Sequence, residues 1–94
     1  MKVLFDPPQL GAARQARTVK QLAQEMAPPD CFGELRVLHP TGEEFVRLVV
    51  IQAGRWPASI ELPRTWLYEE QAEYELRERM AELFHAVAKP VLAH

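Results

Sequence analysis

The residues that could carry chemistry in this chain are few and scattered. There is one cysteine, Cys31, and there are three histidines, at positions 39, 85 and 94. A nucleophilic thiolate needs its pKa lowered by a neighbouring histidine, another cation or a helix N-terminus. Nothing in the spacing brings His39 or His85 to Cys31. We therefore expect Cys31 to be a small buried hydrophobic residue, and we expect no catalytic residues.

Glu82 and His85 form the one pair with the spacing of metal ligands. A carboxylate and an imidazole three residues apart lie on adjacent turns of a helix, as in di-iron bundle proteins. Such sites need a second copy of the motif and further carboxylates, and the sequence has one copy. The four glycines are isolated from one another, so they form no phosphate-binding loop. We expect no metal, no cofactor and no enzyme activity.

Tryptophan and arginine residues are the strongest candidates for binding a partner. They occur together twice, as Arg55-Trp56 and as Arg64-Thr65-Trp66, and both residue types are enriched where protein partners contribute most affinity. A further arginine, Arg47, interrupts the apolar run over residues 45–51. The predicted partner-binding residues are Arg47, Arg55, Trp56, Arg64 and Trp66. The alternative is that both indole rings close the ends of the core, because tryptophan is highly buried on average.

A second candidate surface is basic and lies near the N-terminus. Arg14, Arg17 and Lys20 occur at helical spacing among glutamines 15, 21 and 24. Cations of this kind contact phosphates, and glutamine amides can read adenine edges. Three cations supply little electrostatic affinity, however. A small nucleic-acid-associated regulator is therefore the alternative function, and a protein partner remains the favoured one.

Prolines divide the chain into the elements that must position these residues. The spacing of apolar residues predicts a helix over 9–27 and another over 66–88, the second with Thr65 as its N-cap. Between them, alternation predicts strands at 34–39, 44–52 and 58–62, with a turn at Pro40-Thr41-Gly42-Glu43. The run Val3-Leu4-Phe5 is either a short edge strand or an apolar lead-in.

These elements predict an α+β fold: an N-terminal helix, a three-stranded antiparallel β-meander and a C-terminal helix (α-β-β-β-α). One face of the sheet is expected to carry the core side chains, which are Leu35, Val37, Val46, Leu48, Val50, Ile60 and Leu62. The other face then carries Phe45, Arg47, Val49 and Ile51. If both helices cover the core face, this second face is open, and if they divide between the faces, it is buried.

Composition limits the broad class of the protein. The 94 residues are 48% hydrophobic and 26% charged, with a net charge of −2, which indicates a single small globular domain over residues 1–94. A disordered tail, a disulfide scaffold and a membrane span are excluded, and the small net charge argues against a histone-like DNA coat. With one cysteine and no secretory signal, we expect a cytoplasmic protein.

The function predicted from the sequence is therefore a non-catalytic protein-interaction module. It would act as an adaptor, an accessory subunit or an inhibitor of a larger complex. A homodimer through the sheet face or a sheet edge is one form that this interaction can take.

Overall fold

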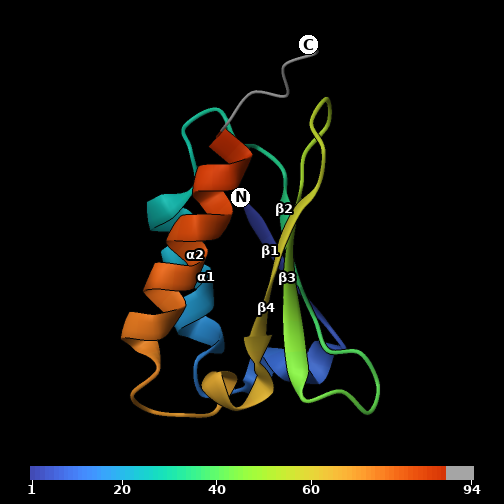
Figure 1. Ribbon diagram of the computed structural model, residues 1–94, viewed down its shortest axis with the longest axis vertical. Helices are drawn as coiled ribbons and strands as arrows, with labels where there is room; N and C mark the ends of the chain where they lie inside the picture. Colours follow the sequence, from blue (N-terminus) through green and yellow to red (C-terminus); the bar gives the residue numbers. More distant parts are fainter. Residues whose placement is uncertain (89–94) are drawn as a thin grey trace.

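The structure is a computed structural model that describes residues 1–88. Four strands, two α-helices and two short 3-10 helices (η) follow one another along the chain (Figure 1). They are β1 (Lys2–Asp6), η1 (Pro8–Ala12), α1 (Ala16–Met26), β2 (Glu34–Leu38), β3 (Phe45–Ile51), β4 (Ala58–Pro63), η2 (Arg64–Leu67) and α2 (Glu73–Ala88). The α+β class predicted from the sequence is confirmed.

The sheet has four strands in the order β1-β2-β3-β4, so the predicted three-stranded antiparallel meander is incomplete. The meander from β2 to β4 is antiparallel as expected. The run at Val3–Phe5 is a real strand, and it pairs parallel to β2, with Val3 opposite Leu35. Because a parallel neighbour requires a crossover, α1 connects β1 to β2. The element order is therefore β-α-β-β-β-α, counting strands and α-helices alone.

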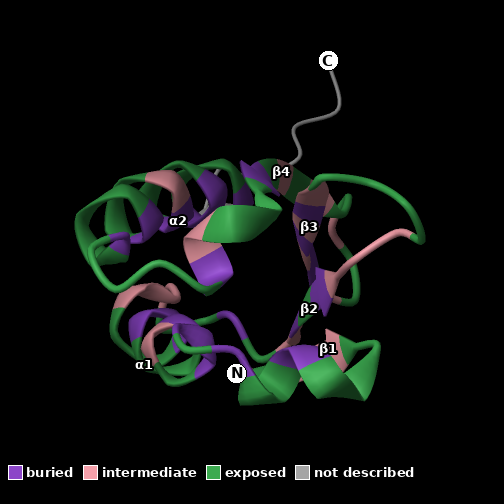
Figure 2. Ribbon diagram, turned by 90° about the horizontal axis from the view of Figure 1, so that it is seen from below, coloured by how far each residue is buried: buried purple, intermediate pink, exposed green. Residues whose placement is uncertain are grey.

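Both helices lie on the same face of the sheet (Figure 2). The seven side chains predicted for the core face point toward them, and six of these are almost completely buried, with Ile60 half-buried. The buried residues of α1 and α2 complete the same cluster. Burying a valine or leucine side chain contributes about 1.5–3 kcal/mol, so this face holds the two layers together. The opposite face, which we call the open face, has no helix over it within residues 1–88.

Both helices are shorter than the apolar spacing predicts. The first is divided into η1 and α1 by the extended backbone of Ala13. The second begins at Glu73, and Thr65 belongs to η2 instead of capping α2. The apolar spacing predicts one buried stripe from Tyr68 to Val87; the stripe is buried from Ala72 onward, whereas Tyr68 lies outside the helix and is exposed.

The turns that join β2 to β3 and β3 to β4 each contain a glycine with a positive φ angle. Gly42 has φ 80° in the turn between β2 and β3, as the proline–glycine pattern predicts, and Gly54 has φ 81° in the turn between β3 and β4. These angles favour glycine because other L-residues rarely adopt them. Among residues 1–88, no helix has the length and apolar character that crossing a membrane requires.

Candidate functional site

The two tryptophans lie at opposite ends of β4. Trp56 precedes the strand in the turn from β3 and is 77% exposed. Trp66 follows it in η2 and packs, partly buried, against the core. A strand of this length spans about 20 Å, so the two indole rings do not form one surface. Of the two, Trp56 is the one that presents its apolar area to solvent.

The three predicted arginines also occupy different places. Arg47 is on the open face, where its guanidinium lies 2.8 Å from the carboxylate of Glu61 and 5.7 Å from the ring centroid of Phe45. Arg55 is in the turn beside Trp56, and Arg64 is exposed at the far end of β4 in η2. The five predicted residues therefore fall into three separate regions: Arg55 with Trp56 before β4, Arg64 with Trp66 in η2, and Arg47 on the open face.

Arg55 joins three segments of the chain. One guanidinium nitrogen donates a hydrogen bond of 2.7 Å to the carbonyl oxygen of Val87, in the last turn of α2. The other lies 2.8 Å from the carboxylate of Asp30. A cation at this end of a helix is stabilised by the helix dipole. The Arg55 side chain, 24% exposed, thus holds the turn from β3 to β4 against the 28–33 loop and α2.

A second aromatic residue, Phe32, projects from the same end of the molecule. It is 87% exposed and lies in the 28–33 loop, between buried Cys31 and Gly33. A Cβ atom at Gly33 would collide with the carbonyl oxygen of Ile51, so this loop runs directly against the end of β3. We use the name hairpin end for this region: residues 28–33, residues 51–57 and the last turn of α2. One apolar residue inside a loop gave no periodic signal, which is why sequence reasoning missed Phe32.

A groove of about 350 Å³ opens between β4 and α2 at the hairpin end. Trp56 and Pro57 form one part of its wall. Ile60 comes from β4, and Leu83 and Val87 come from α2. The groove is therefore mainly apolar inside and has an exposed indole at its mouth. Its volume lies at the lower end of the range of small-molecule pockets, roughly 300–1,000 Å³.

The open face combines apolar side chains, which are half-buried except for the exposed Ile51, with ion pairs. Its apolar members are Leu4, Leu38, Phe45, Val49 and Ile51. Arg36 pairs with Glu34 at 3.2 Å, and Arg47 with Glu61 at 2.8 Å. The hydrocarbon parts of such side chains cover apolar surface while their charges stay in water. This face is therefore partly shielded by its own charged residues, in contrast to the hairpin end.

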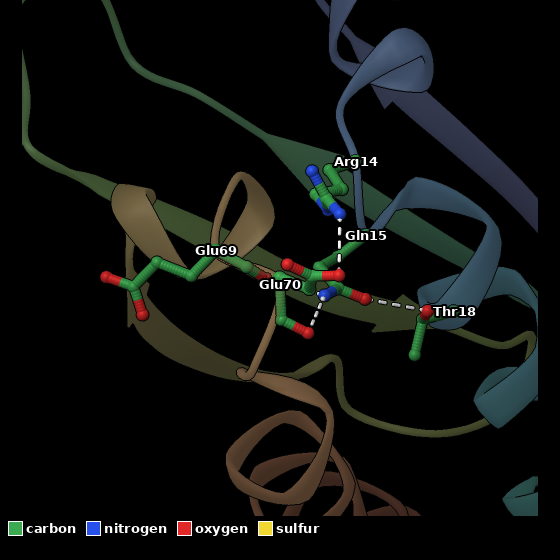
Figure 3. A network of polar contacts seen from close by, with 5 residues as sticks. All are labelled: Arg14, Gln15, Thr18, Glu69 and Glu70. Carbon is green, nitrogen blue, oxygen red and sulfur yellow. Dashed lines mark hydrogen bonds and ion pairs between the residues drawn. The ribbon is translucent and has the colours of Figure 1, made fainter.

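Gln15, whose polar contacts Figure 3 shows, is buried and therefore leaves the predicted basic surface. Its side-chain nitrogen donates to the carbonyl oxygens of Glu69 at 2.6 Å and Glu70 at 3.1 Å, and its side-chain oxygen accepts from Thr18. Its backbone N–H donates to Leu67. The side chain of Gln15 therefore links the start of α1 to the segment before α2 by hydrogen bonds, and it is not part of a binding surface.

The three predicted cations differ in their surroundings. Arg14 lies before α1 and forms an ion pair of 2.9 Å with Glu70. Lys20 has its ammonium 5.6 Å from the ring centroid of Phe5. Arg17 is exposed on α1. Because Glu70 partly neutralises Arg14, the local positive charge is weaker than the sequence pattern indicates.

The residues considered for catalysis or metal binding lie apart. Cys31 is buried before β2 and His39 follows β2, so a whole strand separates them. The Glu82 carboxylate is 2.6 Å from Arg79, and His85 is exposed. Within residues 1–88, no group of three or more His, Cys, Asp or Glu side chains is arranged to hold a metal ion.

One tyrosine on α2 has a perturbed acidity. The hydroxyl of Tyr74 donates a hydrogen bond of 2.7 Å to the carboxylate of Glu78, one turn further along the helix. This hydrogen bond, together with the negative charge of Glu78, raises the pKa of Tyr74. The raised pKa keeps the phenol protonated, so it gives the residue no role as a base.

Comparison with known proteins adds no function. A scan against protein-family models found no match, and searches of curated proteins and of solved structures found none either.

Proposed function

We propose that this chain is a non-catalytic protein-interaction module, such as an adaptor, an accessory subunit or an inhibitor of a larger complex. The observation that carries the proposal is the exposure of Trp56 (77%) and Phe32 (87%) on two loops that Arg55 and Asp30 tie together. Exposed aromatic side chains on a rigid support lose little entropy on binding and contribute strongly to interfaces. The hairpin end is therefore the proposed contact surface.

The predicted anchors have different weights in this proposal. Trp56 is the central anchor, Phe32 on the linked 28–33 loop is a new member, and Arg55 fixes the loop that carries the indole. Arg47, Arg64 and Trp66 lie outside the hairpin end. They can add contacts only to a partner that extends over the open face or along the whole of β4.

The surroundings of Arg14, Arg17 and Lys20 add no support to the nucleic-acid alternative. Two of its three cations have intramolecular contacts, Arg14 with Glu70 and Lys20 with the ring of Phe5. Fewer available cations mean fewer phosphate contacts and a weaker salt-dependent affinity. The bait experiment described next includes nuclease treatment, so that binding to nucleic acid can still be detected.

The test compares two exposed aromatic residues at different ends of the molecule. Tagged wild-type protein, Trp56→Ala and Tyr74→Ala are used as baits in lysate of the source cells, with and without nuclease. Bound proteins are then quantified by mass spectrometry. Tyr74 is 67% exposed and is the matched control. We expect a stoichiometric protein that survives nuclease, is retained by Tyr74→Ala and falls by about tenfold with Trp56→Ala.

Two results would overturn the proposal. A partner retained equally by Trp56→Ala and wild type would remove the hairpin end as the contact surface. Material that disappears with nuclease, and that depends on Arg17 and Lys20 instead, would assign the chain to the nucleic-acid alternative.

A further inference from the structure

The sheet ends in two edge strands, β1 and β4, which differ in how far they are protected from pairing (Figure 2). In β4, the carbonyl oxygen of Glu61 accepts a hydrogen bond of 3.1 Å from the guanidinium of Arg79. Pro57 precedes this strand and Pro63 ends it. Charged side chains and prolines protect a sheet edge from pairing with another chain, so β4 is the protected edge.

The outer side of β1 presents the backbone groups of two residues. The N–H of Lys2 donates to Gly33, and the carbonyl oxygen of Asp6 accepts from the residue that follows β2. Because backbone groups alternate between the two sides of a strand, Val3 and Phe5 direct their N–H and carbonyl groups away from β2. Within residues 1–88, no hydrogen bond reaches these outward groups.

The edge that β1 offers for pairing is limited to residues 2–6. At one end, the carbonyl oxygen of Met1 already accepts 2.8 Å from the side chain of Gln24. At the other end, Pro7 has no N–H to donate. If two β1 strands run antiparallel with Leu4 at the centre, these two positions lie opposite each other. The pairing therefore uses neither of the groups that are missing or occupied.

The five residues of β1, Lys-Val-Leu-Phe-Asp, are complementary to themselves. About a two-fold axis at Leu4, Lys2 of each copy lies opposite Asp6 of the other. Val3 lies opposite Phe5, and because both direct their backbone groups outward, they form the kind of pair that exchanges both N–H···O bonds. Parallel pairing in register would place lysine opposite lysine and aspartate opposite aspartate, which disfavours association.

Lys2 and Asp6 are exposed, and neither forms an ion pair with another residue of the 1–88 region. The other charged residues of the four strands are paired within the chain: Glu34, Arg36, Arg47 and Glu61. Residues directly opposite each other in antiparallel strands project to the same side of the sheet. The two-fold pairing therefore gives Lys2 and Asp6 the opposite charge that each of them lacks, on the open face.

A hollow of about 290 Å³ lies beside Asp6, where the lysine of a second copy would enter. Its walls come from β1, β2 and η1: Leu4, Phe5, Asp6, Pro8, Arg36 and Leu38. The hydrocarbon stem of a lysine can cover such apolar walls while its ammonium meets the Asp6 carboxylate. Arg36 is the cation in this lining, and its guanidinium is already paired with Glu34 at 3.2 Å.

On the helix side of the sheet, the cation nearest to the paired strands is Lys20. Its ammonium lies 5.6 Å from the ring centroid of Phe5 in the same copy. The Phe5 residues of the two copies are diagonal neighbours, about 7–8 Å apart, which is within reach of aromatic side chains. Lys20 is exposed, so water and salt screen the repulsion between the two ammonium groups.

We propose that two copies of this chain pair through β1 about a two-fold axis, so that two four-stranded sheets become one continuous sheet. The helices of both copies then lie on the same face. A five-residue edge is small beside the roughly 800 Å² per partner of a standard stable interface, so the dimer is weak and forms at micromolar concentrations. The inference goes beyond the proposed function, because Trp56 lies at β4, the opposite edge of the sheet.

The test asks whether association follows the signs of the charges at positions 2 and 6. Untagged full-length protein is studied by analytical ultracentrifugation between roughly 5 and 500 μM. We expect Lys2→Asp and Asp6→Lys each to weaken dimerisation by at least about tenfold, because each turns two attractive contacts into repulsive ones. The variant with both substitutions should dimerise like wild type. Circular dichroism confirms that every variant is folded.

Mixing the two single variants is the decisive measurement. Lys2→Asp carries two carboxylates and Asp6→Lys carries two ammonium groups, so a pair of unlike chains regains attraction at both ends. We expect an equimolar mixture to form a heterodimer at concentrations where each variant alone is monomeric. Glu61→Lys is the matched control. It reverses an exposed carboxylate on the same face of the sheet but away from β1, and it should dimerise like wild type.

Amide hydrogen exchange followed by NMR locates the contact without any substitution. The N–H groups of Val3 and Phe5 become bonded between the copies when the dimer forms. We expect their exchange to slow as the protein concentration rises. The N–H of Leu4 faces β2 in the single chain, so its exchange should change much less.

Three results would overturn the proposal: a chain that stays monomeric over the whole concentration range, a dimer that the single substitutions leave intact or their mixture does not restore, and exchange at Val3 and Phe5 that does not depend on concentration. The proposed function is judged separately, because Trp56→Ala should dimerise like wild type. A protein captured in the bait experiment that is lost with Trp56→Ala but retained by Lys2→Asp supports the interaction module whether or not the chain dimerises.

Discussion

One polar side chain contacts the segment just before α2 and another contacts its last turn, and the two side chains differ in burial and charge. Before the helix begins, neutral Gln15, 6% exposed, donates to the carbonyl oxygens of Glu69 and Glu70. In its last turn, charged Arg55 donates to the carbonyl oxygen of Val87 and pairs with the exposed carboxylate of Asp30.

This difference determines what each end can do. Groups that lose a buried partner stay unsatisfied, whereas groups near the surface can bond water instead. Loss of the Gln15 contacts should therefore lower the free energy of unfolding more than loss of the Arg55 contacts. The Arg55 end can exchange contacts with water, salt or a partner, so a binding surface is more readily placed there. The predictions below test this comparison, starting with the largest expected effect.

Replacing Gln15 with alanine should produce the largest loss of stability. The substitution removes the donor side chain of Gln15, which is 6% exposed, from the carbonyl oxygens of Glu69 and Glu70. We expect the free energy of unfolding to fall by about 2–3 kcal/mol. The melting temperature should fall by roughly 10–20 °C for a domain of this size. Thermal and urea denaturation followed by circular dichroism measure both quantities.

Gln21→Ala is the matched control for this prediction. Gln21 is an exposed glutamine on the same helix, and its amide contacts Glu25 on the surface. Its removal should change the free energy of unfolding by less than about 0.5 kcal/mol. A similar loss for both glutamines would show that burial does not distinguish the two contacts.

Replacing Arg55 with alanine should have a smaller effect that depends on salt. The variant loses one ion pair and one hydrogen bond at a partly exposed place, which corresponds to about 0.5–1.5 kcal/mol. Salt at about 1 M screens exposed charges, so the difference between variant and wild type should narrow. Arg36→Ala, which breaks the exposed pair with Glu34, is the control and should cost less. A loss equal to that of Gln15→Ala would contradict the comparison.

Replacing Trp56 with alanine should leave stability almost unchanged. The indole is mostly exposed, so its removal leaves no cavity, and we expect a change within about 0.5 kcal/mol. Trp66→Ala provides the contrast, because Trp66 packs against the core and its truncation should be clearly destabilising. If Trp56→Ala also destabilises the protein strongly, the indole belongs to the core, and the hairpin end loses its proposed anchor.

The sequence predicted the parts of the fold that depend on local periodicity. Alternation along β2, β3 and β4 identified the core face correctly, including Leu35, Val46 and Leu62. The sequence does not decide whether Val3-Leu4-Phe5 is a strand, because three consecutive apolar residues are too few to show a periodicity. Its pairing with β2 is parallel and depends on residues about thirty positions away.

The contacts of polar side chains could not be read from their spacing. Gln15 and Gln21 belong to the same amide-rich stretch of sequence, yet the side chain of Gln15 reaches a segment 54 residues further along. The sequence predicts that Arg55 is available to bind a partner, but its side chain is bonded to Asp30 and Val87, which come from two other elements. Trp56 and Trp66 have similar neighbours in sequence. Their exposure differs because Trp66 follows β4 at the end that packs against the core, whereas Trp56 precedes β4 in an exposed turn.

The smallest effect concerns the contact between Tyr74 and Glu78, which lies near the Gln15 end of α2 but is exposed. It tests whether burial, and not position along the helix, determines stability. The hydrogen bond and the charge of Glu78 raise the pKa of Tyr74 above 10.0, because both favour the protonated phenol. The chain has two tyrosines, so Tyr68→Phe leaves Tyr74 alone for titration by ultraviolet absorbance.

In that background, Glu78→Gln should lower the pKa of Tyr74 with little change in melting temperature at neutral pH. Glu75→Gln is the matched control and should lower the pKa less, since Glu75 is the weakest contributor to the shift. The sign follows from proton binding: a raised pKa in the folded state favours folding below the ordinary tyrosine pKa, and this contribution is lost as the pH rises through the raised value. A large fall in melting temperature with Glu78→Gln would mean that exposed contacts at this end also hold the fold, and the contrast with Arg55 would fail.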